Sequence, residues 1–445
     1  MKSILKIVVR YNAGLLVFLM FVVSEFNNSA SAQDEGYYYH INPYNFIRYD
    51  LNQMHFPGER SAMDHFHDKM EQLMTTGEGR INIVHIGGSH IQAGTFPGQM
   101  RQRFQTANGE MSAGWGFMFP YRIARTNSPF GYYIRYAGAW QSFRNVERRK
   151  SGMLGVGGIS ASTNSPKAEL TILLEKENTI DYGFNKLRIY YQNEENNYQV
   201  YIDTSLVKNK VITVNYIDFS LNDRVDSVTI TLTKNPGQAG EFTLFGITTE
   251  TGPNGIMYHS IGVNGAYVPA FLRCQLFGRQ LADLKPDLVI LGLGINDAYG
   301  RRFSPARFEE NYAQLIAEIK QAAPNAAIVF TTNNDSYLYR RYVNKNGEKV
   351  RESMYKMAKK YNAGVWDMFE VMGGLNSIVL WQRNYLAQSD KIHFTREGYL
   401  LIADLFYTAI MQDFEEYLKT NNKISLNQSE SIKEVTKPAV IESKN

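Results

Sequence analysis

The sequence predicts an α/β protein in which a parallel, doubly wound sheet is interrupted by an antiparallel β-sandwich module. After about residue 256, strands alternate with helices, which is typical of a parallel sheet. Before that, short alternating runs recur about every 10–15 residues with turn signals and without a helical period. The chain has 445 residues, of which 44% are hydrophobic, so it can form two or three domains with cores of their own.

Residues 1–32 have the pattern of a secretory signal peptide. Basic residues precede the apolar run from Ala13 to Val23, and Ala30-Ser31-Ala32 offers an A-x-A cleavage site. Because that run is short for a bilayer, we expect no stable membrane span after cleavage. We therefore expect an exported protein, located in the periplasm, with secretion or the cell surface as alternatives. Cys274 is the single cysteine, so no intrachain disulfide can form.

Charge and histidine spacing restrict the possible partners and cofactors. The formal net charge is +4, and three Lys or Arg and one Glu lie in residues 1–32, so the remainder carries only +2. With no long basic run, nucleic acid is not an expected partner. His65 and His67 lie on a predicted helix, but positions i and i+2 point about 200° apart, so a solvated helix face is expected there instead of a metal site. We expect no metal and no cofactor.

The α/β domain is predicted to begin with a helix and a buried strand. Apolar residues have helical spacing from Ser61 to Thr75, and Ser61 is the expected N-cap. The run from Ile81 to Ile86 is typical of a buried strand, and Gly87-Gly88 ends it. Ser89 follows at the corner where a helix can start. Residues 33–125 are therefore interpreted as an N-terminal segment and the first part of the domain.

Residues 126–250 are predicted to form the inserted β-sandwich module. Six short runs there alternate apolar and polar residues, as strands with one buried face do. They are 168–174, 185–191, 198–202, 211–216, 227–232 and 242–247.

The remainder of the α/β domain is expected over residues 251–420. The predicted elements are a helix from Tyr267 to Asp283, a strand over 287–294, a helix after Ser304-Pro305 to Ala323, a strand over 327–331, a helix near 348–361, a strand over 363–367 and a last helix from Thr395. Residues 421–445 form a polar tail with few aromatic residues, which we expect to be disordered.

Polar residues recur where the predicted strands end. Besides Ser89, they lie in the turns 260–266 and 294–297 and in the loop 389–395 before the last helix. Parallel strands direct their carboxyl ends to one edge of the sheet, so these segments can converge.

The residue types at these turns fit a serine nucleophile. His393 could take the proton of Ser89, and Asp390 could hold the imidazole in the required tautomer. The N–H of Ser89, the N–H of Gly265 and the side-chain amide of Asn296 are the available donors for an oxyanion. Each residue alone also fits a turn or a structural role, but their joint order along the strand ends favours a catalytic site.

These blocks resemble the SGNH (GDSL-type) hydrolase superfamily. The resemblance covers roughly residues 80–125 and 255–415, and Ser89, Gly265, Asn296 and His393 occupy the four positions that name the family. It implies a flavodoxin-like, three-layer α/β/α sandwich and ester hydrolysis through a serine acyl-enzyme. The blocks are Gly87-Gly-Ser89, Gly265, Gly294-Ile-Asn296-Asp297 and Asp390-Lys-Ile-His393.

A narrower similarity is to the peptidoglycan O-acetylesterases. It rests on Ser89-His90, on residues 256–266 and on the inserted β-module, which resembles a carbohydrate-binding domain. It implies an acetylated glycan, peptidoglycan, as the substrate. The family usually has Asp before the nucleophile, where this chain has Gly88, so the turn is altered. A glycan-binding protein without catalysis and a polysaccharide O-acetyltransferase stay open as alternatives.

Overall fold

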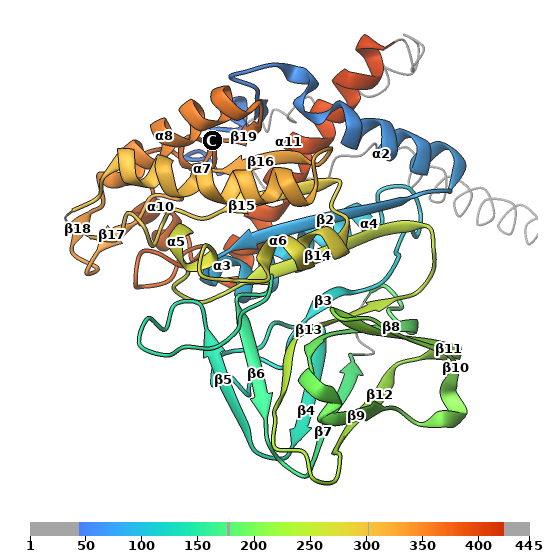
Figure 1. Ribbon diagram of the computed structural model, residues 1–445. Helices are drawn as coiled ribbons and strands as arrows, with labels where there is room; N and C mark the ends of the chain where they lie inside the picture. The colour runs from blue at the N-terminus through green and yellow to red at the C-terminus, as the bar shows by residue number, and fades with distance from the viewer. Residues whose placement is uncertain (1–43, 176–178, 301, 422–445) are drawn as a thin grey trace, which may run out of the picture. The chain divides into compact units, whose positions relative to one another are not determined.

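A computed structural model describes residues 44–175, 179–300 and 302–421 (Figure 1). The expected signal peptide, residues 1–32, and residues 422–445 of the expected tail lie outside these ranges. Residues 44–413 belong to one unit, and the end of the last helix from Phe414 belongs to a second.

The α/β part is built on a sheet of five parallel strands with a short antiparallel strand at one edge. Numbered along the chain, the parallel strands have the spatial order 2-1-3-4-5, which is the flavodoxin-like order. The order of this sheet reverses between the first and third strands, so a ligand site is expected at their carboxyl ends. In spatial order the strands are β14 (Gly255–Gly262), β2 (Arg80–Gly87), β15 (Leu288–Gly292), β16 (Ala327–Thr331), β19 (Gly364–Trp366) and the antiparallel β1 (Met54–His55).

Helices cover both faces of this sheet, as a parallel sheet requires (Figure 1). On one face lie α2 (Asp64–Thr76), α4 (Thr95–Gln105) and α11 (Arg396–Thr420), and Phe96 of α4 lies 6.4 Å from Phe406 of α11. On the other lie α6 (Phe277–Leu284), α7 (Pro305–Ala322) and α8 (Asn346–Tyr361), with Tyr312 of α7 packed 5.5 Å from Phe330 of β16. The predicted three-layer α/β/α fold is confirmed.

An antiparallel β region follows the first strand and helix, as predicted. Its two sheets pack together through apolar side chains, and Tyr198 of one sheet lies 6.1 Å from Phe242 of the other. One sheet contains β10 (Val207–Ile212), β11 (Tyr216–Val225), β8 (Phe184–Gln192), β13 (Phe242–Glu250), β6 (Ile159–Thr163) and β5 (Trp140–Arg144), with β3 (Gly116–Met118) on β13. The other contains β4 (Tyr132–Ala137), β7 (Lys167–Leu174), β12 (Ser227–Lys234) and β9 (Tyr198–Tyr201).

Three local predictions were wrong. The helix expected from Tyr267 to Asp283 is divided into α5 (Val268–Phe271) and α6, because Leu276 bonds to the backbone of Leu154 in the break. Ser61 does not cap a helix, since it lies inside a 3-10 turn before α2. His67 is not on a solvated face, because its side chain is only 2% exposed.

The remaining elements are short. They are α3 (Ser89–Gln92), α9 (Met368–Val371), α10 (Ile378–Arg383), β17 (Tyr337–Leu338), β18 (Tyr342–Val343) and the 3-10 turns Tyr49–Leu51, Arg60–Met63, Glu194–Asn196 and Thr204–Leu206.

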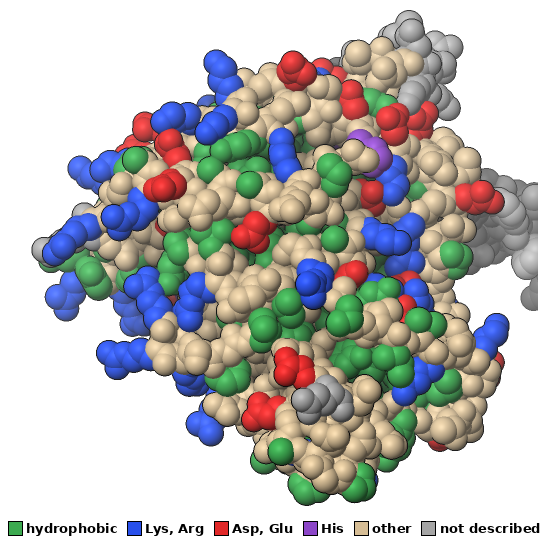
Figure 2. All heavy atoms as spheres, in the orientation of Figure 1, with side chains coloured by type: hydrophobic (Ala, Val, Ile, Leu, Met, Phe, Trp, Pro, Cys, Tyr) green, Lys and Arg blue, Asp and Glu red, His purple; other side chains and the backbone are tan. Residues whose placement is uncertain are grey.

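The surface carries charges of both signs. On the face in Figure 2, Lys and Arg side chains are most crowded at the left edge, where Figure 1 places β17 and β18. Among the described helices, none is long and apolar enough to cross a membrane.

Candidate active site

Ser89 lies at the corner between β2 and α3, at the carboxyl edge of the sheet. Strand β2 ends at Gly87, and Ser89 is the first residue of α3. The neighbouring strands are β14 and β15, so this corner lies where the strand order reverses. The strand that leads to the serine is held in place by its fully buried apolar side chains, which are Ile81, Ile83, Val84 and Ile86.

The hydroxyl of Ser89, the imidazole of His393 and the carboxylate of Asp390 form a continuous hydrogen-bonded chain. Ser89 Oγ lies 2.8 Å from His393 Nε2, and His393 Nδ1 lies 2.7 Å from Asp390 Oδ2. The second carboxylate oxygen accepts the backbone N–H groups of Ile392 and His393 at 2.9 and 3.0 Å. Because Nδ1 donates its proton to the carboxylate, Nε2 is left to accept the proton of Ser89.

These contacts keep Asp390 ionised. Burial opposes the charge, but hydrogen bonds from the His393 side chain and from the backbone N–H groups of His393 and Ile392 outweigh it. The pKa of Asp390 is therefore lowered to about 2. A carboxylate that stays charged can stabilise an imidazolium on His393.

Ser89, Gly265 and Asn296 place three possible donors around one cavity. Gly265 has a φ of +79°, a backbone conformation that favours glycine. The backbone N–H groups of Ser89 and Gly265 donate to no other residue in the described part of the chain. The amide nitrogen of Asn296 donates one proton to Ala266 O at 2.9 Å, which fixes the amide and leaves its second proton available.

The cavity that these residues share has a volume of about 450 Å³. Its lining contains no Lys, Arg, Asp or Glu, so it suits an uncharged substrate group. The lining residues are Ser89, Ala93, Asn127, Asn264, Gly265, Ile295, Asn296, Tyr299, Gln388, Ile392, His393 and Tyr399. Asp390 is not among them and lies behind His393, so the structure brings all five sequence-predicted site residues together, four of them at the cavity itself.

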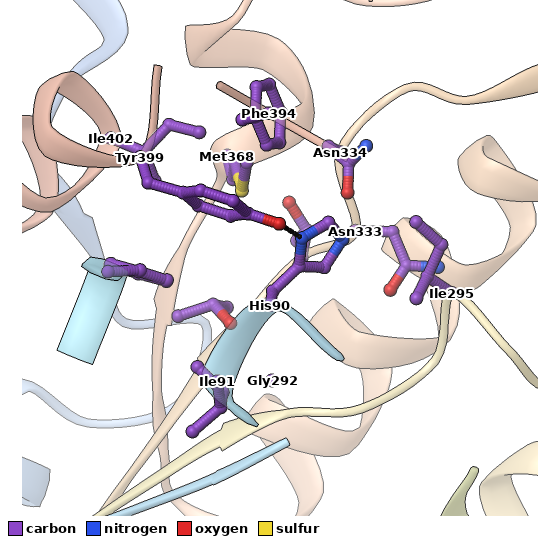
Figure 3. A pocket seen from close by; sticks show the side chains of 13 residues that line it. His90, Ile91, Gly292, Ile295, Asn333, Asn334, Met368, Phe394, Tyr399 and Ile402 are labelled. Carbon is purple, nitrogen blue, oxygen red and sulfur yellow. Dashed lines mark hydrogen bonds between the residues drawn. The ribbon is translucent and has the colours of Figure 1, made fainter. Parts of the chain in front are cut away.

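A buried polar network next to this site was not found from the sequence. Behind the nucleophile, a small cavity of about 30 Å³ is lined by His90, Asn334 and Tyr399, among others (Figure 3). His90 Nδ1 lies 2.7 Å from the hydroxyl of Tyr399, and the His90 ring lies 5.3 Å from that of His393. Burial, and next the nearby His393, lower the pKa of His90 to about 3, so this ring is neutral.

Asn334 connects this network to the loop that carries the histidine. Its amide nitrogen donates to the carbonyl oxygens of Asp335 at 2.8 Å and Ile392 at 3.0 Å. With both N–H groups used, only the side-chain oxygen is left to face His90, and Figure 3 shows it pointing that way. The signal in the sequence was weak: two asparagines one residue after the strand over 327–331.

Two further residues of the motifs lie next to the site. Asp297 accepts the N–H of Val268 with both oxygens, at 3.1 and 3.2 Å, and burial raises the pKa of Asp297 to about 7. A Cβ at Gly88 would lie 3.1 Å from the amide nitrogen of Asn296. The glycine before the nucleophile therefore leaves space that Asn296 uses.

No group of three or more His, Cys, Asp or Glu able to hold a metal ion occurs among the described residues.

Comparisons with known proteins concern the family and the fold. Residues 247–401 match the GDSL-like Lipase/Acylhydrolase family, and this range contains Gly265, Asn296, Asp390 and His393 but not Ser89. No curated protein sequence matches the chain.

Among solved structures, a peptidoglycan O-acetylesterase is similar over 82% of this chain and 99% of its own, with a TM-score of 0.66 and 20% identity. At this identity the likeness concerns the fold. A lipase/acylhydrolase from Enterococcus faecalis is 21% identical over 36% of this chain and 77% of its own, with a TM-score of 0.30. That TM-score is too low to support an argument. The family match over residues 247–401 and the shared fold together support a hydrolase domain similar to the GDSL-like lipase/acylhydrolase family.

Proposed function

We propose that the protein is an exported serine esterase that hydrolyses O-acetyl esters on peptidoglycan or another acetylated polysaccharide. The observation that carries this proposal is the chain from Ser89 through His393 to Asp390 at the wall of an uncharged cavity. A protein that only bound glycan would have no need of this proton path, so the geometry favours catalysis.

In the first half of the reaction, Ser89 Oγ attacks the acetyl carbonyl carbon while His393 Nε2 takes the hydroxyl proton. The carbonyl oxygen becomes an oxyanion and accepts hydrogen bonds from the N–H groups of Ser89 and Gly265 and from the Asn296 amide. Each such donor typically contributes about 2.7–4 kcal/mol to the transition state. The ester C–O bond then breaks, and the leaving sugar oxygen takes the proton from His393.

In the second half, water attacks the acetyl-enzyme. His393 accepts a proton from that water and passes it to Ser89 Oγ as the bond from Oγ to the acetyl carbon breaks, and the acetic acid released ionises to acetate. Throughout, the ionised Asp390 holds His393 in the tautomer that presents Nε2 to the serine. Every group that these steps require is a side chain or backbone N–H of this chain.

The surroundings of the cavity support a glycan as the substrate. Tyr299 lines the cavity, and its ring lies 5.8 Å from that of Tyr339, a residue that is 57% exposed. Exposed tyrosine rings offer a flat apolar face and a polar tip, which suits sugar rings. Peptidoglycan is the first candidate because a peptidoglycan O-acetylesterase shares the fold, including the antiparallel β region. The pattern of residues 1–32 supports export to the compartment where such a substrate is found.

The test is acetate release from O-acetylated peptidoglycan by the purified protein and by Ser89→Ala and His393→Ala. We expect each substitution to lower kcat about 10⁴-fold or more. His65→Ala, at a half-exposed histidine of α2, is the matched control and should retain full activity.

Ser89-dependent cleavage of a small acetyl ester without release from peptidoglycan would reject the substrate and keep the esterase. Full activity of Ser89→Ala would reject the mechanism. Transfer of acetyl to an added sugar in place of water would assign the protein as an acetyltransferase.

A further inference from the structure

The loop that leads into β4 forms part of the wall of the active-site cavity through Asn127. It is tied to the nucleophile helix and to the loop of Gly265 by Gln92, whose side chain is only 2% exposed. Gln92 Oε1 accepts the backbone N–H of Asn264 at 2.7 Å, and Gln92 Nε2 donates to the backbone carbonyl of Asn127 at 2.9 Å. These two backbone contacts leave only one possible orientation for the Gln92 amide.

The orientation of Gln92 fixes that of Asn127 in turn. Gln92 Nε2 also lies 3.1 Å from the side-chain oxygen of Asn127, and the amide nitrogen of Asn264 lies 2.6 Å from the same oxygen. Both nitrogens in addition donate to Thr126 Oγ1, at 2.8 and 3.1 Å. Because Gln92 Nε2 can only donate, a nitrogen of Asn127 at this place would set two N–H donors against each other, so this atom is the acceptor oxygen of Asn127. The amide nitrogen of Asn127 is then on the opposite side, and it donates to no other residue that the structure describes.

Within the cavity, Asn127 therefore presents only hydrogen-bond donors, because its acceptor oxygen is already used. Such a group pairs best with an oxygen that only accepts, and an amide carbonyl is the strongest neutral acceptor of this kind. A carboxylate is disfavoured, because no Lys or Arg lines the cavity. A hydroxyl would leave its own proton unmatched by Asn127.

We propose that Asn127 is a substrate-binding residue that donates a hydrogen bond to the carbonyl oxygen of an N-acyl group on the sugar that carries the ester. This inference rests on the proposed function, because the ester places the sugar next to Ser89. The scissile carbonyl is held by the Ser89, Gly265 and Asn296 donors, and the N-acyl carbonyl is held by Asn127.

The test compares two esters that differ only in the N-acyl group, 6-O-acetyl-N-acetylglucosamine and 6-O-acetylglucose. For the unsubstituted protein, we expect kcat/KM to be about 3- to 10-fold higher for the N-acylated sugar, the value of one net hydrogen bond. Asn127→Asp keeps an acceptor for Gln92 and Asn264 but removes both donors, and it should lower the ratio to about 1. Asn127→Ala removes the donors without adding a charge, so the same loss there would exclude a charge effect.

A second measurement does not depend on catalysis. In the Ser89→Ala background, an NMR titration compares the affinity for N-acetylglucosamine with that for glucose, with and without Asn127→Asp. If the N-acyl preference requires Asn127, the binding role is supported even when no ester is cleaved. In that case only the proposed esterase activity is rejected. Ser89-dependent cleavage with the same substrate ratio in all Asn127 variants would overturn the role of Asn127 alone. Absence of any N-acyl preference in both measurements would also overturn it.

Discussion

The side chain of Asn334 donates a hydrogen bond to the carbonyl oxygen of Ile392 at 3.0 Å, across 58 positions of the chain. Ile392 directly precedes His393, and its N–H binds Asp390. On its other side, Asn334 faces His90, the residue after the nucleophile (Figure 3). One buried amide thus connects the turn of Ser89 with the loop that carries Asp390 and His393.

Asn334→Asp should lower kcat and leave KM nearly unchanged. A carboxylate cannot donate to Ile392 O or Asp335 O, and its charge would lie against both carbonyl oxygens. The loop must then shift, and a displacement of about 1 Å between reacting groups can reduce kcat about 10²-fold. Steady-state kinetics on a small acetyl ester measures this, with thermal unfolding as a check on folding. A change confined to KM, or unchanged kcat, would show that the bond does not position His393.

Restoring a side chain before the nucleophile should reduce activity in this protein. In Gly88→Ala, the new Cβ would lie 3.1 Å from Asn296 Nδ2 and 3.5 Å from Ala266 O, so the oxyanion donor must move by a few tenths of an ångström. We expect kcat to fall by up to about 10-fold for Ala, since one such donor is worth about 2.7–4 kcal/mol when lost completely, and further for Asp. Gly98→Ala is the control, because nothing lies within 4 Å of its added Cβ. Higher activity of Gly88→Asp than of the unsubstituted protein would contradict this account.

The sequence predicted those parts of the site that follow from strand ends. Ser89, Gly265 and Asn296 each follow a strand that is mostly buried, and parallel strands direct their carboxyl ends to one edge. His393 and Asp390 were found because their spacing in one loop suits a hydrogen-bonded pair. The alternation of strands and helices predicted a parallel sheet, and the flavodoxin-like order was implied by the family resemblance.

Features that depend on contacts between distant residues could not be predicted in this way. The break between α5 and α6 arises from bonds to Leu154, which belongs to the antiparallel region. The burial of His67 depends on packing across the fold, whereas a local helical pattern only places it on a polar face. The orientation of Asn127 depends on the side-chain amides of Gln92 and Asn264. These residues lie 35 and 137 positions from Asn127 in the sequence.

Asp390→Asn should lower kcat about 10³- to 10⁴-fold while the protein still folds. The amide could no longer accept both the ring N–H of His393 and the backbone N–H groups as a carboxylate does, so the imidazole would lose the tautomer that presents Nε2 to Ser89. Asp404→Asn, which removes a carboxylate paired with Arg103 at 2.7 Å on α11, is the matched control. Single-turnover kinetics on an acetyl ester separates the loss in the acylation rate from any loss of binding. Equal effects of the two substitutions would mean that Asp390 only supports the fold.

The burial of Asp297 gives a pH dependence of stability whose sign is opposite to that of Asp390. Burial raises the pKa of Asp297 to about 7, so between about pH 4 and 7 the folded protein holds a proton that the unfolded chain releases. The contribution of Asp297 to the free energy of unfolding is therefore lost as the pH rises through this window. Asp390, with a pKa lowered to about 2, contributes stability above about pH 4 that is lost only at lower pH.

Asp297→Asn isolates this effect because Asn keeps an acceptor for the N–H of Val268 and cannot ionise. Burial also raises the pKa of Asp335, to about 6, so its contribution to stability changes with pH in the same direction. Because Asp335 is present in both proteins, this contribution cancels in the comparison. We expect the difference in the free energy of unfolding, variant minus unsubstituted, to increase by about 2–4 kcal/mol between pH 4.5 and pH 8.5. Denaturant unfolding at these two pH values measures it. Parallel pH curves for the two proteins would show that Asp297 is ionised in the fold without cost.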